Sequence, residues 1–241
     1  MENKEVALVT GANGFVGSHL VDYLLSKNFM VKCLVRKSSN LRWLEGKNVE
    51  IFKCGLFDRS GIKTAMEDVN YVFHVAGVVK AKNKEGYFKG NVDATKILLE
   101  MAEENKQNIK RFVVISSQTV TGPSYDDKPV NENTECKPLT TYAKSKFEQE
   151  KLVLGYKDKI PVTICRAPAI YGERDTEIFI YFQTFSKGLT SLIGFDKKIL
   201  SLLHVADLAA GLFLAATSEK SVGEIYFISS EKFYTWDEVG A

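Results

Sequence analysis

The sequence predicts an α/β fold with a doubly wound parallel sheet. Short apolar runs rich in β-branched residues alternate with longer amphipathic segments up to about residue 167, which is typical of βαβ units. A glycine-rich turn after the first run is the second observation. Because βαβ crossovers are right-handed, we expect helices on both faces of the sheet, as in a Rossmann-type fold. The expected strands are Val6–Thr10, Val31–Val35, Val49–Lys53, Tyr71–Val75, Arg111–Ser117 and Val162–Ala167.

The segments between these strands carry apolar residues at helical spacing. The expected helices are Gly14–Lys27, Arg59–Met66, Asn91–Asn105 and Tyr142–Tyr156. Strands and helices therefore alternate through residues 1–172, which we expect to form one Rossmann-type domain.

The alternation loosens after Gly172. The expected elements of this part are an apolar stretch at Ile178–Leu203, a helix at Asp207–Thr217 and a strand at Glu224–Ile228. We expect residues 173–241 to form a small second region, interleaved with the last strands of the sheet. Thr235 and Glu238 have the spacing of a helix N-cap and its capping-box partner. Because that helix should continue beyond Ala241, the sequence is expected to be incomplete at this end.

The composition is that of an ordinary globular protein, with 45% hydrophobic and 26% charged residues and a net charge of +2 in 241 residues. No apolar run reaches the roughly 20 residues that span a bilayer. The polar start lacks the order of a secretory signal, so a cytoplasmic protein without a membrane partner is expected. The lysines are scattered, which argues against a nucleic-acid partner. The cysteines lack ligand spacing, so no metal is expected. The sequence leaves open whether the protein forms a homodimer.

The glycine-rich turn has the pattern of a dinucleotide-binding loop, because it follows a strand and begins a helix. Gly11 would permit the tight turn, Gly14 would let backbone N–H groups approach a pyrophosphate, and Gly17 would let the helix pack closely on the sheet. The helix N-terminus would then face the phosphates with its partial positive charge. The cofactor-binding residues expected here are Gly11, Asn13, Gly14, Phe15, Val16 and Gly17.

The second strand is followed by Arg36, Lys37 and Ser38 rather than by a carboxylate. An acidic residue at this place would bind the ribose hydroxyls of NAD, whereas an arginine suits the 2′-phosphate of NADP. We therefore expect NADP, with NAD as the alternative, and Arg36 as a cofactor ligand. The other interpretation is that Arg36 and Lys37 are simply solvated.

Two tyrosines are followed four residues later by a lysine. We interpret Tyr23 and Lys27, on the first helix, as a partly buried face with a solvated lysine. Tyr142 and Lys146 begin the helix after the fifth strand, whose end at Ser117 lies where ligands of open α/β sheets bind. Their position after this strand therefore makes Tyr142 and Lys146, and not Tyr23 and Lys27, the candidate catalytic pair.

Residues four apart share one face of a helix, so the Lys146 ammonium is expected near the Tyr142 hydroxyl. A charge about 5 Å away, at an effective dielectric of roughly 20, would lower a phenol pKa of ~10 by on the order of two units. Ser117 would hydrogen-bond the substrate oxygen while Tyr142 exchanges its proton. The expected catalytic residues are Ser117, Tyr142 and Lys146.

These motifs resemble those of the extended short-chain dehydrogenases, also called the NAD-dependent epimerase/dehydratase superfamily. The resemblance covers nearly the whole chain. It is carried by Thr10-Gly11-Ala12-Asn13-Gly14-Phe15-Val16-Gly17, Phe73-His74-Val75-Ala76-Gly77, Asn91-Val92, Ser116-Ser117, Tyr142-Ala143-Lys144-Ser145-Lys146, Arg166-Ala167-Pro168, Tyr171-Gly172 and His204-Val205-Ala206-Asp207. Within the family, the sequence most resembles the dihydroflavonol-reductase-like branch, including the segment Leu41–Gly46.

The resemblance implies a tyrosine acid/base at Tyr142, a lysine that holds the nicotinamide ribose at Lys146, and a serine that polarises the substrate at Ser117. It also implies that the Ala76 and Gly77 backbone contacts the cofactor and that the segment around Pro168 lies beside the nicotinamide. It further implies that residues 1–172 form the NAD(P)-binding domain and residues 173–241 a partial substrate-binding region. In several respects the sequence departs from the family.

Many members have an aspartate after the third strand, where this chain has Gly55. Asp58, a little further on, is a candidate cofactor ligand and equally a candidate cap of the next helix. Many nucleotide-sugar epimerases have an arginine just before the position of His204, where this chain reads Ile199–Leu203. His74 and His204 are interpreted as structural hydrogen-bonding residues, because neither has an acidic neighbour in sequence.

Three functions remain open at this point. The first is an NAD(P)-dependent oxidoreductase that transfers hydride at a secondary alcohol or ketone of a small or apolar substrate. The second is a nucleotide-sugar epimerase or dehydratase, which uses the same three residues but retains its NAD. The third is a non-catalytic, cofactor-binding regulator, which the complete set of catalytic residues disfavours.

Overall fold

The protein forms a seven-stranded parallel sheet in the order β3-β2-β1-β4-β5-β6-β9. The structure is a computed structural model, and it describes residues 4–124, 128–187, 199–235 and 238–239. The strands are β1 (Val6–Thr10), β2 (Met30–Val35), β3 (Val49–Lys53), β4 (Tyr71–His74), β5 (Arg111–Ser117), β6 (Val162–Ala167) and β9 (Ile225–Phe227). The expected Rossmann-type fold is confirmed, and four of the six strands predicted up to residue 167 have the expected bounds.

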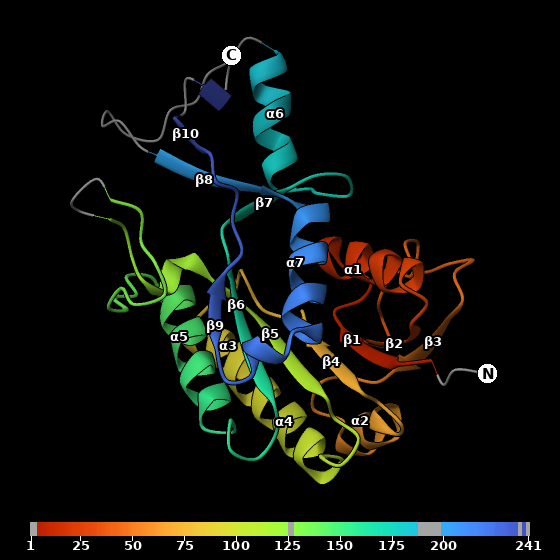
Figure 1. Cartoon of the computed structure of the whole chain (residues 1–241). Coiled ribbons are helices and arrows are strands. Elements are labelled where there is room, and N and C mark those ends of the chain that lie inside the picture. The colour runs from red at the N-terminus through yellow and green to blue at the C-terminus, as the bar shows by residue number, and fades with distance from the viewer. Residues whose placement is uncertain (1–3, 125–127, 188–198, 236–237, 240–241) are drawn as a thin grey trace.

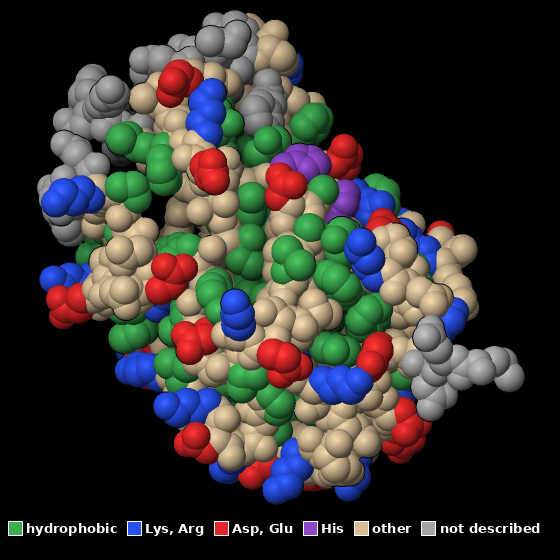
Figure 2. Space-filling model, in the orientation of Figure 1, with side chains coloured by type: hydrophobic (Ala, Val, Ile, Leu, Met, Phe, Trp, Pro, Cys, Tyr) green, Lys and Arg blue, Asp and Glu red, His purple; other side chains and the backbone are tan. Residues whose placement is uncertain are grey.

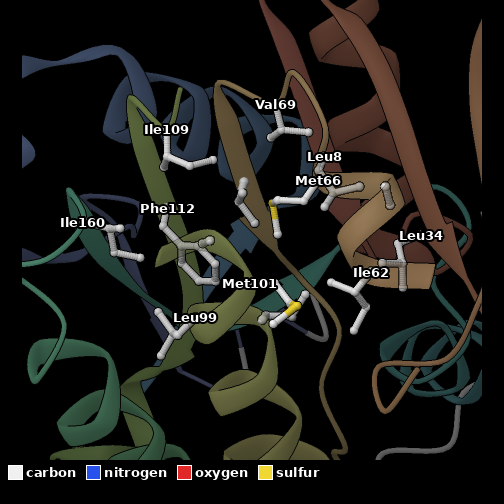
Figure 3. Packing of buried hydrophobic residues seen from close by; sticks show 14 of the residues in the cluster. Leu8, Leu34, Ile62, Met66, Val69, Leu99, Met101, Ile109, Phe112 and Ile160 are labelled. Carbon is white, nitrogen blue, oxygen red and sulfur yellow. The ribbon is translucent and has the colours of Figure 1, made fainter. Parts of the chain in front are cut away.

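Helices cover both faces of this sheet (Figure 1). The covering helices are α1 (Phe15–Ser26) and α7 (Val205–Thr217) on one face, and α2 (Arg59–Met66), α4 (Ala94–Glu104) and α5 (Thr141–Leu154) on the other. Strand side chains alternate between the faces. Ala7 and Val9 of β1 pack under α1 and α7, whereas Leu8 belongs to the core under α2 and α4. Figure 3 shows the latter core, in which Leu8, Met66 and Phe112 are fully or almost fully buried.

The helix expected at Asn91–Asn105 has a more complex beginning. A short helix, α3 (Lys84–Phe88), runs into a π-helical turn, η1 (Lys89–Asp93), before α4 begins. A Cβ on Gly90 would lie 2.2 Å from Cγ2 of Val78, so this turn packs against the segment after β4 without room for a side chain. The wider turn directs Asn91 inward, where it is fully buried.

A second, three-stranded sheet follows the carboxyl end of β6. Its strands are β7 (Ala169–Tyr171), β8 (Ile199–His204) and β10 (Phe233–Thr235), with β8 parallel to β7 and antiparallel to β10. Together with α6 (Ile178–Ser186) it lies beyond the carboxyl edge of the main sheet (Figure 1). The capping box is present: the Glu238 N–H donates to Thr235 Oγ1 over 3.3 Å, and the Thr235 N–H donates to Glu238 Oε2 over 2.8 Å.

The face seen in Figure 2 mixes acidic and basic side chains around bands of hydrophobic ones. Within the described ranges, none of the helices is long and apolar enough to cross a membrane.

Candidate active site

The turn after β1 packs so closely against neighbouring backbone that a side chain would not fit at two positions. Gly11 has a left-handed backbone with φ of +67°, and a Cβ there would lie 3.0 Å from the backbone N and Cα of Ala76. A Cβ on Gly17 would lie 2.1 Å from the Gly11 carbonyl oxygen. Glycine at these positions brings the first turn of α1 and the end of β4 against the same loop.

The N-terminus of α1 is suited to an anion. Gly14 is its N-cap, and no side chain of the described residues caps the helix there. A Cβ on Gly14 would approach a single heavy atom within 4 Å, the Gly11 oxygen at 3.3 Å, so the space beside it is open. The unsatisfied N–H groups and the helix dipole both favour a phosphate at this place. The loop therefore fits the pyrophosphate of a dinucleotide. Asn13 connects the loop to the segment after β2, since its Nδ2 donates to the Asn40 carbonyl over 3.3 Å.

The end of β4 lies between this loop and α5. The Ala76 N–H donates to Thr10 Oγ1 over 3.2 Å. A Cβ on Gly77 would lie 3.3 Å from Asn91 Oδ1 and 4.0 Å from Lys146 Nζ. Ala76 and Gly77 thus line the same edge of the sheet as Gly11 and Lys146.

The buried His74 imidazole joins the elements around this edge. The Thr95 hydroxyl donates to the Asn91 carbonyl over 2.6 Å, so its oxygen accepts from His74 Nε2 at 2.8 Å. His74 Nδ1 then accepts from the Thr10 hydroxyl, also at 2.8 Å. Burial, together with the charge of Lys146, lowers the pKa of His74 to about 3. A neutral imidazole with one donor and one acceptor nitrogen satisfies this network.

Tyr142 lies in the first turn of α5, and its hydroxyl is hydrogen-bonded to Ser117 at the end of β5. Thr140 caps the helix, because its Oγ1 accepts from the Ala143 N–H at 3.1 Å. Ser117 Oγ also accepts from the Thr119 N–H at 3.3 Å and from the Thr119 hydroxyl at 3.0 Å. Because the Thr119 N–H and hydroxyl both donate to Ser117 Oγ, the Ser117 hydroxyl does not donate to Thr119, and its proton is available for Tyr142.

The expectation that Lys146 lowers the pKa of Tyr142 is wrong for this structure. Burial raises the pKa of the Tyr142 hydroxyl, and the hydrogen bond from Ser117 offsets part of that effect. Lys146 Nζ instead donates to the Ile115 carbonyl over 2.7 Å. Burial lowers the pKa of Lys146 itself to about 8, while the charge of Glu150 raises it. For the pKa of Tyr142, burial in low-dielectric surroundings thus outweighs the effect of the Lys146 charge that the four-residue spacing suggested.

The remaining expected ligands lie at the same edge or beside it. Arg36 follows β2 and is exposed. Asp58 caps α2, since its Oδ1 accepts from the Gly61 N–H at 3.0 Å, and this bond, with one from Ser60, lowers the pKa of its carboxyl group. Pro168 follows Ala167, the strand partner of Ser117, and therefore lies next to the candidate catalytic residues.

Two of the sequence interpretations concern residues outside this edge. The Lys27 ammonium lies 5.2 Å from the centre of the Tyr23 ring, which packs against Phe213 of α7, so this pair is a packing contact as interpreted. His204 accepts from the Ala206 N–H at 3.3 Å and thereby caps α7. The folded chain does bring an acidic partner to it, with the Glu173 carboxylate 3.5 Å away.

Sequence reasoning missed three residues near the site. Tyr87 of α3 packs its ring 6.4 Å from that of Tyr142. Glu150 and Arg166 form a buried ion pair behind Lys146. The signal for Glu150 was its spacing, because it continues the Tyr142–Lys146 spacing by four residues on a helix face that should be apolar.

Comparison with known proteins defines the class to which this fold and edge belong. Residues 7–229 match the NAD dependent epimerase/dehydratase family, and the chain belongs to that family. It is therefore an NAD-dependent enzyme of this superfamily, which sets aside the non-catalytic alternative. The expected dihydroflavonol-reductase-like branch stays a prediction.

Several individual proteins are similar to it. The ceramide reductase of Caulobacter vibrioides is 28% identical over 235 residues, covering 97% of this chain and 68% of the reductase. A protein named as the uncharacterized UDP-glucose epimerase YtcB of Bacillus subtilis is 28% identical over 238 residues, covering 90% of this chain and 74% of the relative. The crystal structure of gox2253 superposes with a TM-score of 0.88 at 26% identity, covering 98% of this chain and 73% of that one.

Proposed function

We propose that the chain transfers a hydride between NADP and a secondary alcohol or ketone, with Tyr142 as the proton donor and acceptor. The observation that carries this proposal is the arrangement at the ends of β4 and β5. The Tyr142 hydroxyl is hydrogen-bonded to Ser117, and Lys146 lies one helical turn further, facing the Gly77 backbone. A substrate oxygen placed against Tyr142 and Ser117 would meet two hydroxyl donors.

In reduction of a ketone, the bound cofactor would supply the hydride. The raised pKa keeps Tyr142 protonated at neutral pH, so its phenol is ready to give a proton to the developing alkoxide. Ser117 would hold the same oxygen and, afterwards, stabilise the phenolate by donating to it. Lys146 would hold the nicotinamide ribose through its ammonium group. The reverse order of proton transfers serves oxidation of the alcohol.

The dinucleotide would be held along the carboxyl edge of the sheet. We assign the pyrophosphate to the first turn of α1, the nicotinamide half to Gly77 and Pro168, and the adenosine half to the end of β2. The exposed Arg36, with Lys37 beside it, supports NADP because a guanidinium pairs well with a 2′-phosphate. Asp58 is already occupied as a helix cap, which leaves it a weaker candidate ligand.

We propose residues 1–172 as the nucleotide-binding part and residues 173–241 as the substrate-binding part. The second part exposes several large apolar side chains: Phe179 and Ile180 of α6, Ile199 of β8 and Phe233 of β10 are all exposed. A nucleotide diphosphate needs paired cations, because uncompensated desolvation of its charges is costly. This composition therefore favours a largely apolar or small substrate, and the name of the ceramide reductase points the same way.

A nucleotide-sugar epimerase or dehydratase is the second candidate, favoured by the similarity to the Bacillus subtilis relative named as a UDP-glucose epimerase. The two functions differ in what binds. We expect turnover of an aliphatic or aromatic ketone panel with NADPH and no calorimetric binding of UDP or UDP-sugars. Micromolar binding of a UDP-sugar without ketone turnover would establish the second candidate instead.

A further inference from the structure

Three polar residues follow one another at four-residue spacing along the buried side of α5. Tyr142 and Lys146 are the first two, and Glu150 is the third. Lys146 retains 4% and Glu150 only 1% of its exposed surface. Residues four apart on a helix are neighbours, so the carboxylate lies on the turn directly behind the ammonium group.

Arg166 of β6 fixes the position of this carboxylate. Its Nε donates to Glu150 Oε1 over 3.0 Å, and its Nη2 donates to Glu150 Oε2 over 2.8 Å. Arg166 is 2% exposed, and its guanidinium lies 5.4 Å from the centre of the Phe227 ring and also contacts Cys136 Sγ at 3.2 Å. The planar, two-point contact holds both carboxylate oxygens and prevents Glu150 from turning away from its helix.

Stability alone is a weak reason for such a pair, because well-packed apolar residues often replace buried ion pairs without loss. The charge balance suggests another reason. Burial drives Lys146 toward its neutral form, and the charge of Glu150 opposes this. The other titratable groups around Lys146 give no such help, since His74 is neutral with a pKa of about 3, Tyr142 is protonated, and Arg166 is itself a cation.

We propose that Glu150, held by Arg166, is a positioning residue that keeps Lys146 in its charged ammonium form at the carboxyl end of β5. Its significance for turnover rests on the proposed function, in which that ammonium holds the nicotinamide ribose. The effect of the Glu150 carboxylate on the charge of Lys146 involves only residues of the protein, so it does not require a bound cofactor.

The direct test is an NMR titration of Lys146 in the cofactor-free protein, labelled with ¹³C at lysine Cε and assigned by the signal that a Lys146→Met variant lacks. Removing the carboxylate charge in Glu150→Gln should lower the pKa of Lys146 by about one to two units, for charges roughly 6 Å apart at an effective dielectric of about 20. Glu148→Gln is the matched control, because Glu148 lies on the same helix but pairs at the surface with Lys151.

Glu150→Gln leaves Arg166 buried and unpaired, so this variant alone can fail to fold. The double variant Glu150→Gln/Arg166→Met removes both charges and should recover most of the wild-type melting temperature. The pKa of Lys146 should nevertheless remain below that of the wild type, and the high-pH fall in turnover should move to lower pH with it.

A double variant with a wild-type pKa at Lys146 would show that the pair is only structural and would overturn the inference. Wild-type protein that turns over no ketone would contradict the proposed function instead, while the titration would still decide the role of Glu150.

Discussion

The Thr10 hydroxyl and the His74 imidazole lie 2.8 Å apart and join the carboxyl ends of β1 and β4 inside the protein. The same Thr10 oxygen accepts the Ala76 N–H, so one residue links the imidazole to the backbone that faces the glycine loop. The relative position of the two candidate cofactor-binding segments therefore depends on a neutral His74.

This relationship predicts that stability falls in mild acid. The pKa of His74 is about 3 in the folded protein and 6.5 for an unperturbed side chain, so the unfolded chain binds more protons between these values. Stability is consequently lost as the pH falls below 6.5, by about 2 kcal/mol at pH 5 for this one residue. Urea unfolding at pH 7.5 and pH 5 measures the effect. The loss should shrink in His74→Asn and persist in His204→Asn; equal losses in all three proteins would refute it.

The glycines of the loop should separate folding from nucleotide binding. Gly17→Ala places a Cβ against the Gly11 carbonyl and should destabilise the fold by about 1–3 kcal/mol. Gly14→Ala meets the Gly11 oxygen at 3.3 Å and occupies the space proposed for the pyrophosphate, so the melting temperature should fall much less than in Gly17→Ala while nucleotide affinity falls by on the order of tenfold. Gly55→Ala, where a Cβ meets nothing within 4 Å, is the control for the melting temperature. Unchanged nucleotide affinity in Gly14→Ala would place the pyrophosphate elsewhere.

Arg36→Ala tests the choice of cofactor. Only NADP carries the 2′-phosphate, so the variant should bind NADPH at least about tenfold more weakly and NADH almost as the wild type does. Lys63→Ala removes an exposed cation that pairs with Glu104 at 3.3 Å and should change neither affinity. Fluorescence titration with both nucleotides makes the comparison. Equal weakening for NADPH and NADH in Arg36→Ala would disprove the assignment.

The central sheet was predictable from the sequence because each buried strand is a short apolar run between helices. Val6–Thr10 and Arg111–Ser117 have their expected bounds for this reason. The π-helical turn at Asn91 was not foreseen, since the close approach of Gly90 to Val78, in the loop after β4, is a contact that the local sequence pattern does not indicate. The second sheet escaped prediction for a similar reason: β7 has three residues and forms only by pairing with β8, far along the chain.

The candidate catalytic residues were likewise identified by spacing, but their electrostatics were not. The four-residue spacing of Tyr142 and Lys146 placed both on one face of α5. The spacing carried no information about how deeply that face is buried. Burial raises the pKa of Tyr142, which is the opposite of the expected shift. Arg166, an isolated cation within an apolar strand, was the available sign that this face holds charges.

In the proposed function, the Tyr142 hydroxyl is the group that transfers the proton. Tyr142→Phe removes that proton and little else, so ketone turnover with NADPH should fall by on the order of a hundredfold or more, with nucleotide affinity nearly unchanged. Tyr23→Phe, the other tyrosine with a lysine four residues on, should retain the wild-type rate. Steady-state turnover of the three proteins, with NADPH affinity measured in parallel, gives the answer. A Tyr142→Phe enzyme that keeps more than about a tenth of the wild-type rate would contradict the account.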